Sequence, residues 1–387
     1  MSGPGDDPVL DALGPWLDRS ARGGRGVLLA VSGGPDSTAL MHAAAALREA
    51  SGASVAVATV DHGLRPGSDA EAADVGRAAR TLGLPHTRLP WAGPKPGTGL
   101  QEAARDVRYA LLSAHAAAIG AGLVLTGHTR DDQAETVLMR LAAGSGLAGL
   151  AGMRAERELA PGLVLGRPFL HLPKAILVAW CEARGLAYLR DPSNADPRFA
   201  RGRLRGAWPL LEREGLTPAR LARLAERAAR DEAALRSVAA QALAAMRLPG
   251  AAEAQPRLDG AVLVAQPDAV ALRCIDIALT RAGAAPRRLE RLEALVFESL
   301  LPALRRRQPI RRTLAGFLIA ADARGIVSLA PAPPRRRRAS SAALAAGQAR
   351  LLGKGEPPAY IGEVCTDGPP EPSDASIRGS HTPRIDR

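Results

Sequence analysis

The stretch Val31–Ser37, VSGGPDS, lies between the apolar run GVLLA and the alanine-rich segment TALMHAAAALREA. Small residues at a junction of this kind let backbone amides close around an anion, and the amino end of the following helix adds partial positive charge. A nucleotide phosphate fits such a turn. The loop lacks the Gly-Lys-Ser/Thr ending of a Walker A motif, which disfavours a kinase or motor ATPase. The alternative is an ordinary turn in which Pro35 and Asp36 only support the helix start.

Outward from this loop, short apolar runs alternate with helix-patterned segments over residues 26–128. The runs GVLLAVSG, SVAVATVDHG and LVLTGHT are typical of buried parallel strands. Helices are expected over Pro35–Ala50, Asp69–Leu82 and Gln101–Ile119. This alternation predicts an α/β fold, a Rossmann-like parallel sheet with helices on both faces. Ligands of such sheets bind beyond the carboxyl ends of the strands.

The pattern changes after residue 216. Thr217 and Pro218 are typical of the start of a long helix, whose apolar residues recur at spacings of three and four. Two more helical segments and an alternating, hairpin-like stretch, TLAGFLIAADARGIVSLA, follow. We therefore expect an N-terminal segment (1–24), a catalytic domain (25–215), a helical linker (216–248), a small α+β domain (249–330) and a basic, disordered tail (331–387).

Composition narrows the class of protein. The net charge of +12 comes almost wholly from arginine, whose planar fork matches phosphate oxygens, although a biased genome composition would give the same excess. Cys181, Cys274 and Cys365 are far apart, which disfavours a zinc site or a disulfide framework. The amino end lacks an apolar signal core and no run is long enough to cross a membrane, so we expect a cytoplasmic protein with no membrane contact.

Ser32–Ser37 match the signature SGGxDS, and in this the chain resembles the PP-loop ATP pyrophosphatase superfamily. Its members cleave ATP between the α and β phosphates and adenylate an oxygen of their substrate. Three further stretches resemble the tRNA(Ile)-lysidine synthetase family in particular: VDHGLRPGSDAEA (60–72), GHTRDDQAETVLMRLAAGSGLAGLAGM (127–153) and DPSNADPRFARGRLRGAWPLL (191–211). With EAARDVRY (102–109), the resemblance covers about residues 25–215.

The resemblance implies a reaction. ATP and Mg²⁺ would be the cofactors, and free lysine and the isoleucine tRNA with a CAU anticodon the partners. Adenylation of the 2-keto oxygen of the wobble cytidine would let the lysine amine displace AMP, giving lysidine and changing the codon read from AUG to AUA. The C-terminal unit would help to hold the tRNA, and the oligomeric state, including a homodimer, is left open.

The resemblance also implies the site residues. The residues expected to bind ATP are Ser32, Gly33, Gly34, Pro35, Asp36, Ser37, Asp61, His62 and Gly127, with Asp36 also assisting the metal ion. The residues expected to act in catalysis are Asp36, His128, Asp132, Glu135 and Arg205. The residues expected to contact lysine or tRNA are Arg105, Asp132, Glu135, Arg201 and Arg205.

The acidic segment GHTRDDQAET allows two interpretations. Asp132 and Glu135 are three residues apart at a helix start, so both can face the loop and hold Mg²⁺ or the ammonium of lysine. Asp131 and Asp132 could instead only complement the helix dipole. Two residues depart from the family pattern: Thr129 replaces a second histidine, and Gly202 replaces an asparagine.

The roles of several other side chains also allow two interpretations. Asp61 and His62 could reach the ligand or only form a hydrogen-bonded turn before Gly63. Arginine pairs usually solvate a helix face, an interpretation that we slightly favour for Arg108. The same alternative applies to the arginines at positions 287, 288 and 305–307, which are candidates for tRNA contact.

Two rival functions remain. One is a PP-loop ligase acting on a small acid or nucleotide, and the other is a catalytically silent RNA-binding protein. A tRNA thiolase is disfavoured because no cysteine precedes Cys181. The rivals differ in whether ATP is consumed and whether its use requires RNA.

Overall fold

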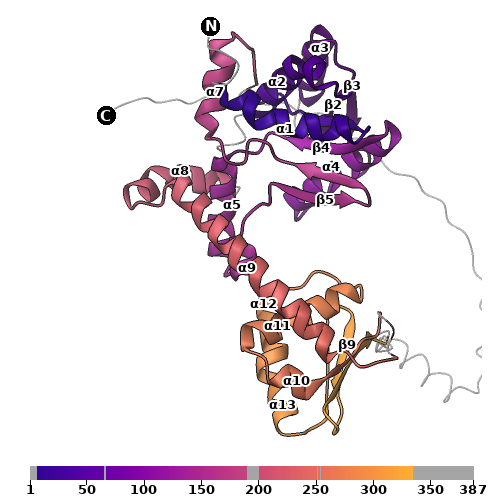
Figure 1. Ribbon diagram of the computed structural model, residues 1–387. Helices are drawn as coiled ribbons and strands as arrows, with labels where there is room; N and C mark the ends of the chain where they lie inside the picture. The colour runs from indigo at the N-terminus through magenta and orange to yellow at the C-terminus, as the bar shows by residue number, and fades with distance from the viewer. Residues whose placement is uncertain (1–6, 65–66, 190–199, 251, 253, 334–387) are drawn as a thin grey trace, which may run out of the picture. The chain divides into compact units, whose positions relative to one another are not determined.

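The computed structural model describes residues 7–64, 67–189, 200–250, 252 and 254–333, without the side chains of Ala200 and Arg201 (Figure 1). Contacts group residues 1–332 into one unit and residues 333–387 into another. The tail predicted to be disordered therefore lies almost wholly outside the described residues. Within the described ranges, no helix is both long and apolar enough to span a membrane.

The amino-terminal sheet has six strands in the order β3-β2-β1-β4-β6-β5. Their bounds are β1 (Gly26–Ala30), β2 (Val55–Asp61), β3 (His86–Pro90), β4 (Ala121–Thr126), β5 (Glu156–Ala160) and β6 (Leu163–Gly166). Strand β1 pairs in parallel with both β2 and β4, so the predicted α/β class is confirmed. The structure adds three strands to those expected, β3, β5 and β6, and β5 pairs antiparallel with β6 because a tight turn joins the two.

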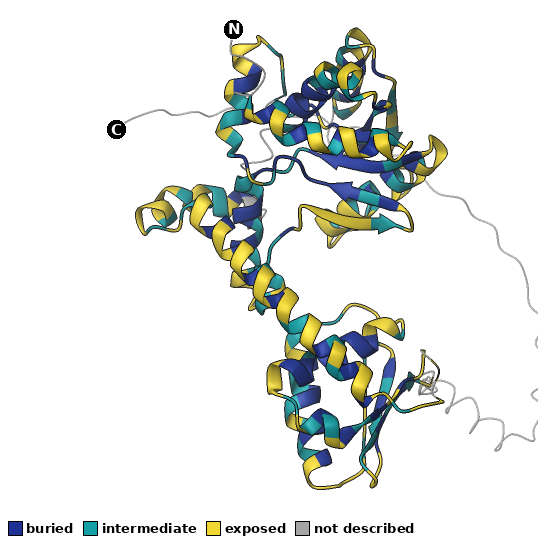
Figure 2. Ribbon diagram, in the orientation of Figure 1, coloured by how far each residue is buried: buried dark blue, intermediate teal, exposed yellow. Residues whose placement is uncertain are grey.

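Helices cover both faces of this sheet, as predicted (Figure 1). They are α1 (Pro8–Arg22), α2 (Pro35–Ser51), α3 (Ser68–Thr81), α4 (Leu100–Ala118), α5 (Arg130–Ala142), α6 (Leu147–Leu150) and α7 (Lys174–Ala183). Alternate residues of β1 face opposite sides: Val27 and Leu29 pack with α1, α2 and α7, whereas Leu28 packs with Tyr109 and Leu112 of α4. Strands buried on both faces explain the continuous apolar runs of the sequence, and Figure 2 shows them in the colour of buried residues.

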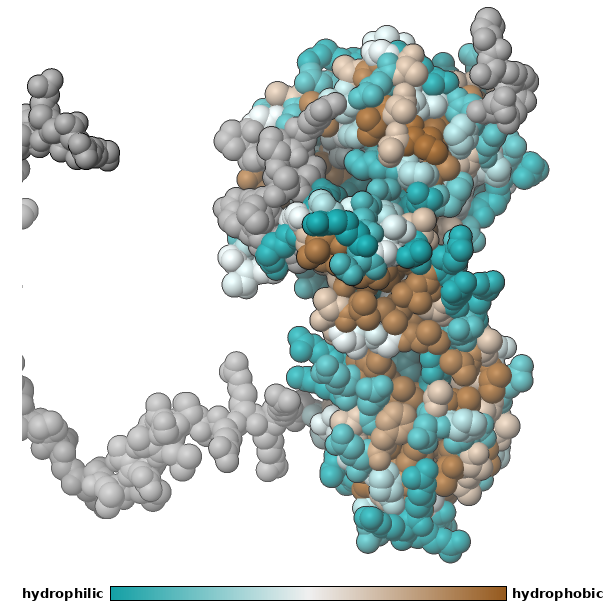
Figure 3. Space-filling model, turned by 90° about the vertical axis from the view of Figure 1, so that its left-hand side faces the viewer, coloured by the Kyte–Doolittle hydropathy of each residue, from teal (hydrophilic) through white to brown (hydrophobic). Residues whose placement is uncertain are grey.

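Beyond the sheet, α8 (Ala200–Arg213) and α9 (Pro218–Met246) pack against α5 through a small apolar cluster. The predicted start of the long helix is confirmed, because the hydroxyl of Thr217 accepts from the amide of Arg220. Leu210 and Leu224 remain exposed on these helices. Figure 3 views this side of the molecule, where apolar areas alternate with hydrophilic ones.

The end of α9 packs into a second core with a four-stranded antiparallel sheet of order β7-β10-β9-β8. Its strands are β7 (Arg257–Asp259), β8 (Ile310–Leu314), β9 (Phe317–Ala321) and β10 (Ile326–Pro331). Its helices are α10 (Gly260–Val264), α11 (Asp268–Arg281), α12 (Leu289–Glu293), the π-helical η2 (Ala294–Leu300) and α13 (Leu301–Arg305). The α+β character is thus confirmed, while the domain boundaries stay predictions.

Candidate active site

The two glycines of the loop after β1 have different roles. Gly33 has a φ of 84°, and a Cβ there would lie 2.6 Å from Cδ1 of Leu189. The amide of Leu189 donates to the carbonyl of Gly33 over 2.8 Å, which holds the two segments together. At Gly34, by contrast, a Cβ would meet no atom within 4 Å. Gly33 therefore permits the turn, whereas Gly34 leaves open space above it.

Serine hydroxyls close this loop from within. The Oγ of Ser37 donates to the carbonyl of Gly34 over 3.0 Å and accepts from the amide of Ser32 over 3.2 Å. Helix α2 begins at Pro35 without a side-chain cap, so its first turn offers backbone amides and partial positive charge to an anion. Gly127, at the end of β4, packs against this turn, because a Cβ there would lie 2.7 Å from the carbonyl oxygen of Asp36.

Asp36 lies in this first turn and is paired with Lys174, the first residue of α7. The Nζ of Lys174 donates to Oδ2 of Asp36 over 2.5 Å, while Oδ1 is buried without a hydrogen-bond partner. Burial raises the pKa of Asp36, the Lys174 ammonium opposes this rise, and the charges of Asp132 and Asp131 add to it. The buried free oxygen marks a position where a cation could be bound.

Asp132 caps helix α5 through one of its oxygens. Its Oδ2 accepts from the amide of Thr129 over 2.8 Å and from the Thr129 hydroxyl over 2.9 Å. The Thr129 hydroxyl in turn accepts from the amide of Asp132 over 3.4 Å, which completes a capping box. Thr129, which departs from the family's second histidine, is therefore the helix cap, and it orients a carboxylate that lines the cavity.

Glu135 is buried one turn further along α5 and is paired with Arg205 of α8. Nε of Arg205 donates to Oε1 over 2.6 Å and Nη2 donates to Oε2 over 3.3 Å, the bidentate geometry of a strong ion pair. Burial acts to lower the pKa of Arg205, but the bond to Glu135 and the charges of Glu135, Asp132 and Asp36 raise it overall. The guanidinium is thus held among three carboxylates.

His128 lies between β4 and α5 and is kept neutral by its surroundings. Its Nδ1 is 2.7 Å from the hydroxyl of Thr126. Burial, aided by the charges of Arg108, Arg167 and Arg105 and opposed by Asp132, lowers the pKa of His128 to about 3. An imidazole with such a pKa can exchange hydrogen bonds near pH 7, but it cannot serve there as a proton donor.

These groups surround one cavity of about 350 Å³ at the carboxyl ends of β1 and β4. Its polar and charged lining consists of Ser32, Asp36, Ser37, Glu71, Arg108, Thr126, His128, Asp132, Lys174 and Arg205. Parallel sheets bind ligands at the carboxyl ends of their strands, at the point where the strand order reverses direction. The cavity lies at such a point, because β2 and β4 pair with opposite edges of β1. It combines an anion-binding turn with carboxylates and cations, a mixture suited to a nucleotide together with a cationic substrate.

Comparison with known proteins identifies the family. A family profile for the PP-loop domain matches residues 12–209. The tRNA(Ile)-lysidine synthase of Methylobacterium sp. (strain 4-46) is 57% identical over 334 residues, which are 86% of this chain and 96% of that protein. The tRNA(Ile)-lysidine synthase of Rhodopseudomonas palustris is 45% identical over 349 residues, covering 87% of this chain and 99% of its own length.

The chain belongs to the tRNA(Ile)-lysidine synthase family. A solved U34-tRNA thiolase from Methanococcus maripaludis superposes with a TM-score of 0.47 and 17% identity over 57% of this chain and 76% of its own. The PP-loop domain implies the use of ATP by this lysidine synthase family member.

In this synthase family member, three of the residues expected to bind ATP, Gly33, Asp61 and His62, lie outside the cavity lining. Asp61 accepts from the amide of Gly63 over 2.9 Å and from Nε of Arg88 over 3.0 Å, as in the hydrogen-bonded turn that was the alternative. Burial would raise the pKa of Asp61, but its bonds to Arg88 and Gly63 lower it overall. His62 packs edge-on against Trp91 at 6.0 Å between ring centroids. A contact of either residue with ATP stays a prediction.

The arginines expected to contact the substrates are also divided. Arg205 lines the cavity, whereas Arg105 stacks on Tyr109, with its guanidinium carbon 5.2 Å from the ring centroid. The side chain of Arg201 lies outside the described residues, as do residues 191–199 of the motif that contains it. Arg287, a candidate for tRNA contact, instead forms an ion pair with Asp276, and its Nε donates to Oδ1 over 2.9 Å.

The structure adds three charged lining residues that sequence reasoning did not assign: Glu71, Arg108 and Lys174. For Arg108, the slight preference for a solvated helix face does not fit its place in the lining. Lys174 had one signal, because it is one of only three lysines in the chain and follows the apolar turn GRPFLHLP. Nothing local linked it to Asp36, which is 138 residues away.

Proposed function

We propose that this chain joins free lysine to the 2-position of the wobble cytidine in the CAU anticodon of isoleucine tRNA, converting ATP to AMP and pyrophosphate. The observation that carries the proposal is the convergence of an uncapped PP-loop helix, Asp36, Asp132 and Arg205 on one cavity. Together with the family, this geometry favours an adenylating ligase over the two rivals. A cytoplasmic location follows from such a substrate, and a homodimer stays an expectation.

In the first step ATP would lie with its phosphates over Gly34 and the first turn of α2. The residues present fit a magnesium ion, because Asp36 offers a buried oxygen without a partner and Mg²⁺ is commonly held by one or two carboxylates together with phosphate oxygens. When bound, the ion would neutralise charge on the phosphates. Within the described residues, no group of three or more His, Cys, Asp or Glu side chains could form a metal cage.

Adenylation would use the cations of the cavity. The 2-keto oxygen of cytidine attacks the α-phosphorus, and the bond to the β-phosphate oxygen breaks to release pyrophosphate. Negative charge then shifts onto the leaving pyrophosphate, and the ammonium of Lys174 and the guanidinium of Arg108, which both line the cavity, would stabilise it. Lys174 would leave Asp36 for the phosphates, which frees the carboxylate for the metal ion.

In the second step the lysine amine attacks C2 of the activated ring. The new C–N bond replaces the C–O bond, and AMP departs with the former keto oxygen. The incoming ammonium must first lose a proton, and Asp132 and Glu135 are the proposed groups that position it. Glu135 is already paired with Arg205, so we expect these two residues to set the shape and charge of the lysine site together.

Incorporation of labelled lysine into unmodified isoleucine tRNA bearing CAU tests this function, with methionine tRNA of the same anticodon as the control. Label in the isoleucine tRNA alone is the expected result. ATP–pyrophosphate exchange that proceeds without RNA would instead favour a ligase of small molecules. Tight tRNA binding without any ATP consumption would favour the silent RNA-binding protein.

A further inference from the structure

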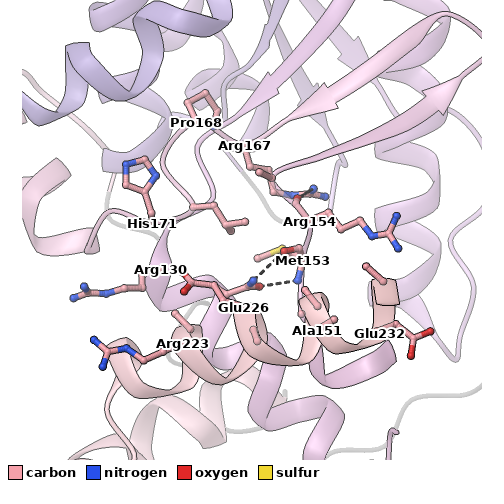
Figure 4. A pocket seen from close by; sticks show the side chains of 18 of the residues that line it. Arg130, Ala151, Met153, Arg154, Arg167, Pro168, His171, Arg223, Glu226 and Glu232 are labelled. Carbon is pink, nitrogen blue, oxygen red and sulfur yellow. Dashed lines mark hydrogen bonds between the residues drawn. The ribbon is translucent and has the colours of Figure 1, made fainter. Parts of the chain in front are cut away.

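A second cavity, of about 830 Å³ and shown in Figure 4, is lined by Arg130 and Gln133 of α5, whereas Asp132 of the same helix lines the ATP cavity. It is lined by α1, by α5, by the loops before β5 and after β6, and by the first half of α9. None of the site residues expected from the sequence lines it. We define it as the arginine cavity, from the five arginines in its lining: Arg130, Arg154, Arg167, Arg223 and Arg236.

The charges of the arginine cavity are unbalanced. Its acidic lining residues are Glu226 and Glu232. Glu232 is shared between two arginines, because its Oε2 accepts from Nε of Arg273 over 3.1 Å and its Oε1 is 3.8 Å from Nη1 of Arg236. Arg236 is compensated by Asp276, 3.3 Å away. Within the described ranges, none of the other four arginines is in a salt bridge, and Glu226 is the acid left among them.

Two of these guanidinium groups carry a buried donor with no acceptor. Arg167 is only 3% exposed, its Nη1 donates to the carbonyl of Arg154 over 2.6 Å, and its Nε is without a partner. The Nε of Arg130, at the start of α5, is also buried and unpaired. Burial, aided by the charges of Arg157 and Arg105, lowers the pKa of Arg167, although its side-chain hydrogen bond to Tyr109 opposes this change. Leaving such donors unsatisfied costs free energy that an acceptor bound in the cavity would recover.

The ATP cavity also has a buried polar atom without a partner, but there the atom is an acceptor rather than a donor. Within the described residues, four buried side-chain nitrogen or oxygen atoms are unpaired: Oδ1 of Asp36, Nδ1 of His62, and Nε of Arg130 and Arg167. Asp36 lines the ATP cavity, whereas Arg130 and Arg167 line the arginine cavity. The two cavities are therefore complementary to different ligands.

The walls of the arginine cavity are held in place by hydrogen bonds. The amide of Gln133 donates to the carbonyl of Met153 over 2.9 Å and its carbonyl accepts from the Met153 amide over 2.7 Å. Figure 4 shows these two bonds beside Arg130 and Arg154. Arg140 fixes the preceding loop through the carbonyls of Gly149 and Gly152. A wall fixed before binding lowers the entropic cost of holding a ligand.

We propose that the arginine cavity is a second phosphate-binding site, separate from the ATP cavity. Guanidinium forks bind phosphate oxygens two at a time, and a phosphate bound beside Arg130 or beside Arg167 would supply the acceptor that its Nε lacks. Two sources share this chemistry: a backbone phosphate of the bound tRNA, and a free phosphate compound such as pyrophosphate. Only the first source depends on the proposed function.

The test uses Arg154→Gln combined with Arg223→Gln in the full-length protein. Both side chains are exposed, so the fold should tolerate the change. The matched control is Arg227→Gln with Arg230→Gln, which removes the same charge from exposed positions of α9 outside the cavity. Thermal unfolding of both double variants should match that of the original chain.

The first measurement is the affinity for unmodified isoleucine tRNA, without ATP or lysine, over a series of KCl concentrations. The second is a calorimetric titration with inorganic pyrophosphate, after the ATP cavity has been filled with a non-hydrolysable ATP analogue. If the source is the tRNA backbone, the cavity variant should bind tRNA about tenfold more weakly than the control, and its salt slope should fall by about one to two.

If the source is a free phosphate compound, tRNA affinity should match that of the control, while the pyrophosphate signal disappears only in the cavity variant. Equal behaviour of the two double variants in both measurements would overturn the proposal. Failure of the proposed function looks different: the unaltered chain would then incorporate no lysine, whereas the two binding measurements would still compare cavity and control variants.

Discussion

The two cavities that α5 helps to line differ in how their charges are paired. At the ATP cavity, Asp36 is joined to Lys174 and, beside it, Glu135 is joined to Arg205, although Oδ1 of Asp36 keeps no partner. In the arginine cavity, Arg130 and Arg167 keep buried donors that have none. A paired site can exchange its partners for a nucleotide and an ammonium during a reaction, whereas an unpaired cationic site can only take up an anion. We therefore interpret the ATP cavity as the reaction site and the arginine cavity as a binding site only.

The largest effect should come from removing the charge of Asp36. We expect Asp36→Asn to lower lysine incorporation by at least about 10³-fold, because the negative charge that would hold the metal ion is lost. Because burial raises the pKa of Asp36 above its unfolded value, the stability linked to its proton is present at low pH and lost as pH rises through the folded pKa. The variant should therefore unfold at a higher temperature than the original chain near pH 7.

Asp18→Asn, an exposed change on α1, is the control for both measurements. Substantial lysine incorporation by Asp36→Asn would show that the pairing of this carboxylate is only structural.

The second effect concerns the Glu135 and Arg205 pair. Arg205→Gln leaves a buried carboxylate without its bidentate partner, and we expect the free energy of unfolding to fall by about 1 to 3 kcal/mol. The partly exposed guanidinium is screened by water, so the loss should be smaller than for a fully buried pair. Denaturant unfolding measures it. Adding Glu135→Gln should restore part of the stability, and a strictly additive double variant would contradict the pairing.

A smaller effect should follow from Lys174→Met. The ammonium of Lys174 opposes the rise in the pKa of Asp36, so its removal should move that pKa further upward. The acidic limb of the pH–rate profile should then shift to higher pH, in addition to a loss of rate. Lys95→Met, which removes a lysine outside the cavity lining, should leave the profile in place. An unshifted limb with reduced rate would assign Lys174 to phosphate binding alone.

The smallest effect should appear at His128. Burial lowers its pKa to about 3, so its imidazole signals in NMR should not titrate between pH 5 and 9. The lowered pKa also means that its contribution to stability is complete above the unfolded pKa and is lost as pH falls from about 6.5 toward 3. His128→Gln should flatten this part of the stability profile. A titration midpoint near 6.5 would place the ring in water rather than in the cavity wall.

Much of the fold could be predicted from local patterns. The three helices expected between residues 35 and 119 begin and end within one residue of α2, α3 and α4, because helix periodicity is a local property of the chain. The antiparallel strand β5 was not predicted, since its residues are half polar and lie at the sheet edge. The phosphate loop was predicted because its glycines and serines act within seven consecutive residues.

The PP-loop, the α/β fold and the family follow from the order of the amino acids alone, because each depends on residues that are close together in the chain. The pairing of Lys174 with Asp36, of Arg205 with Glu135 and of Arg88 with Asp61 became visible only in the folded chain. Folding also brought arginines from two loops and two helices into one cavity. Such pairings depend on how distant elements pack, which no local periodicity of the sequence records.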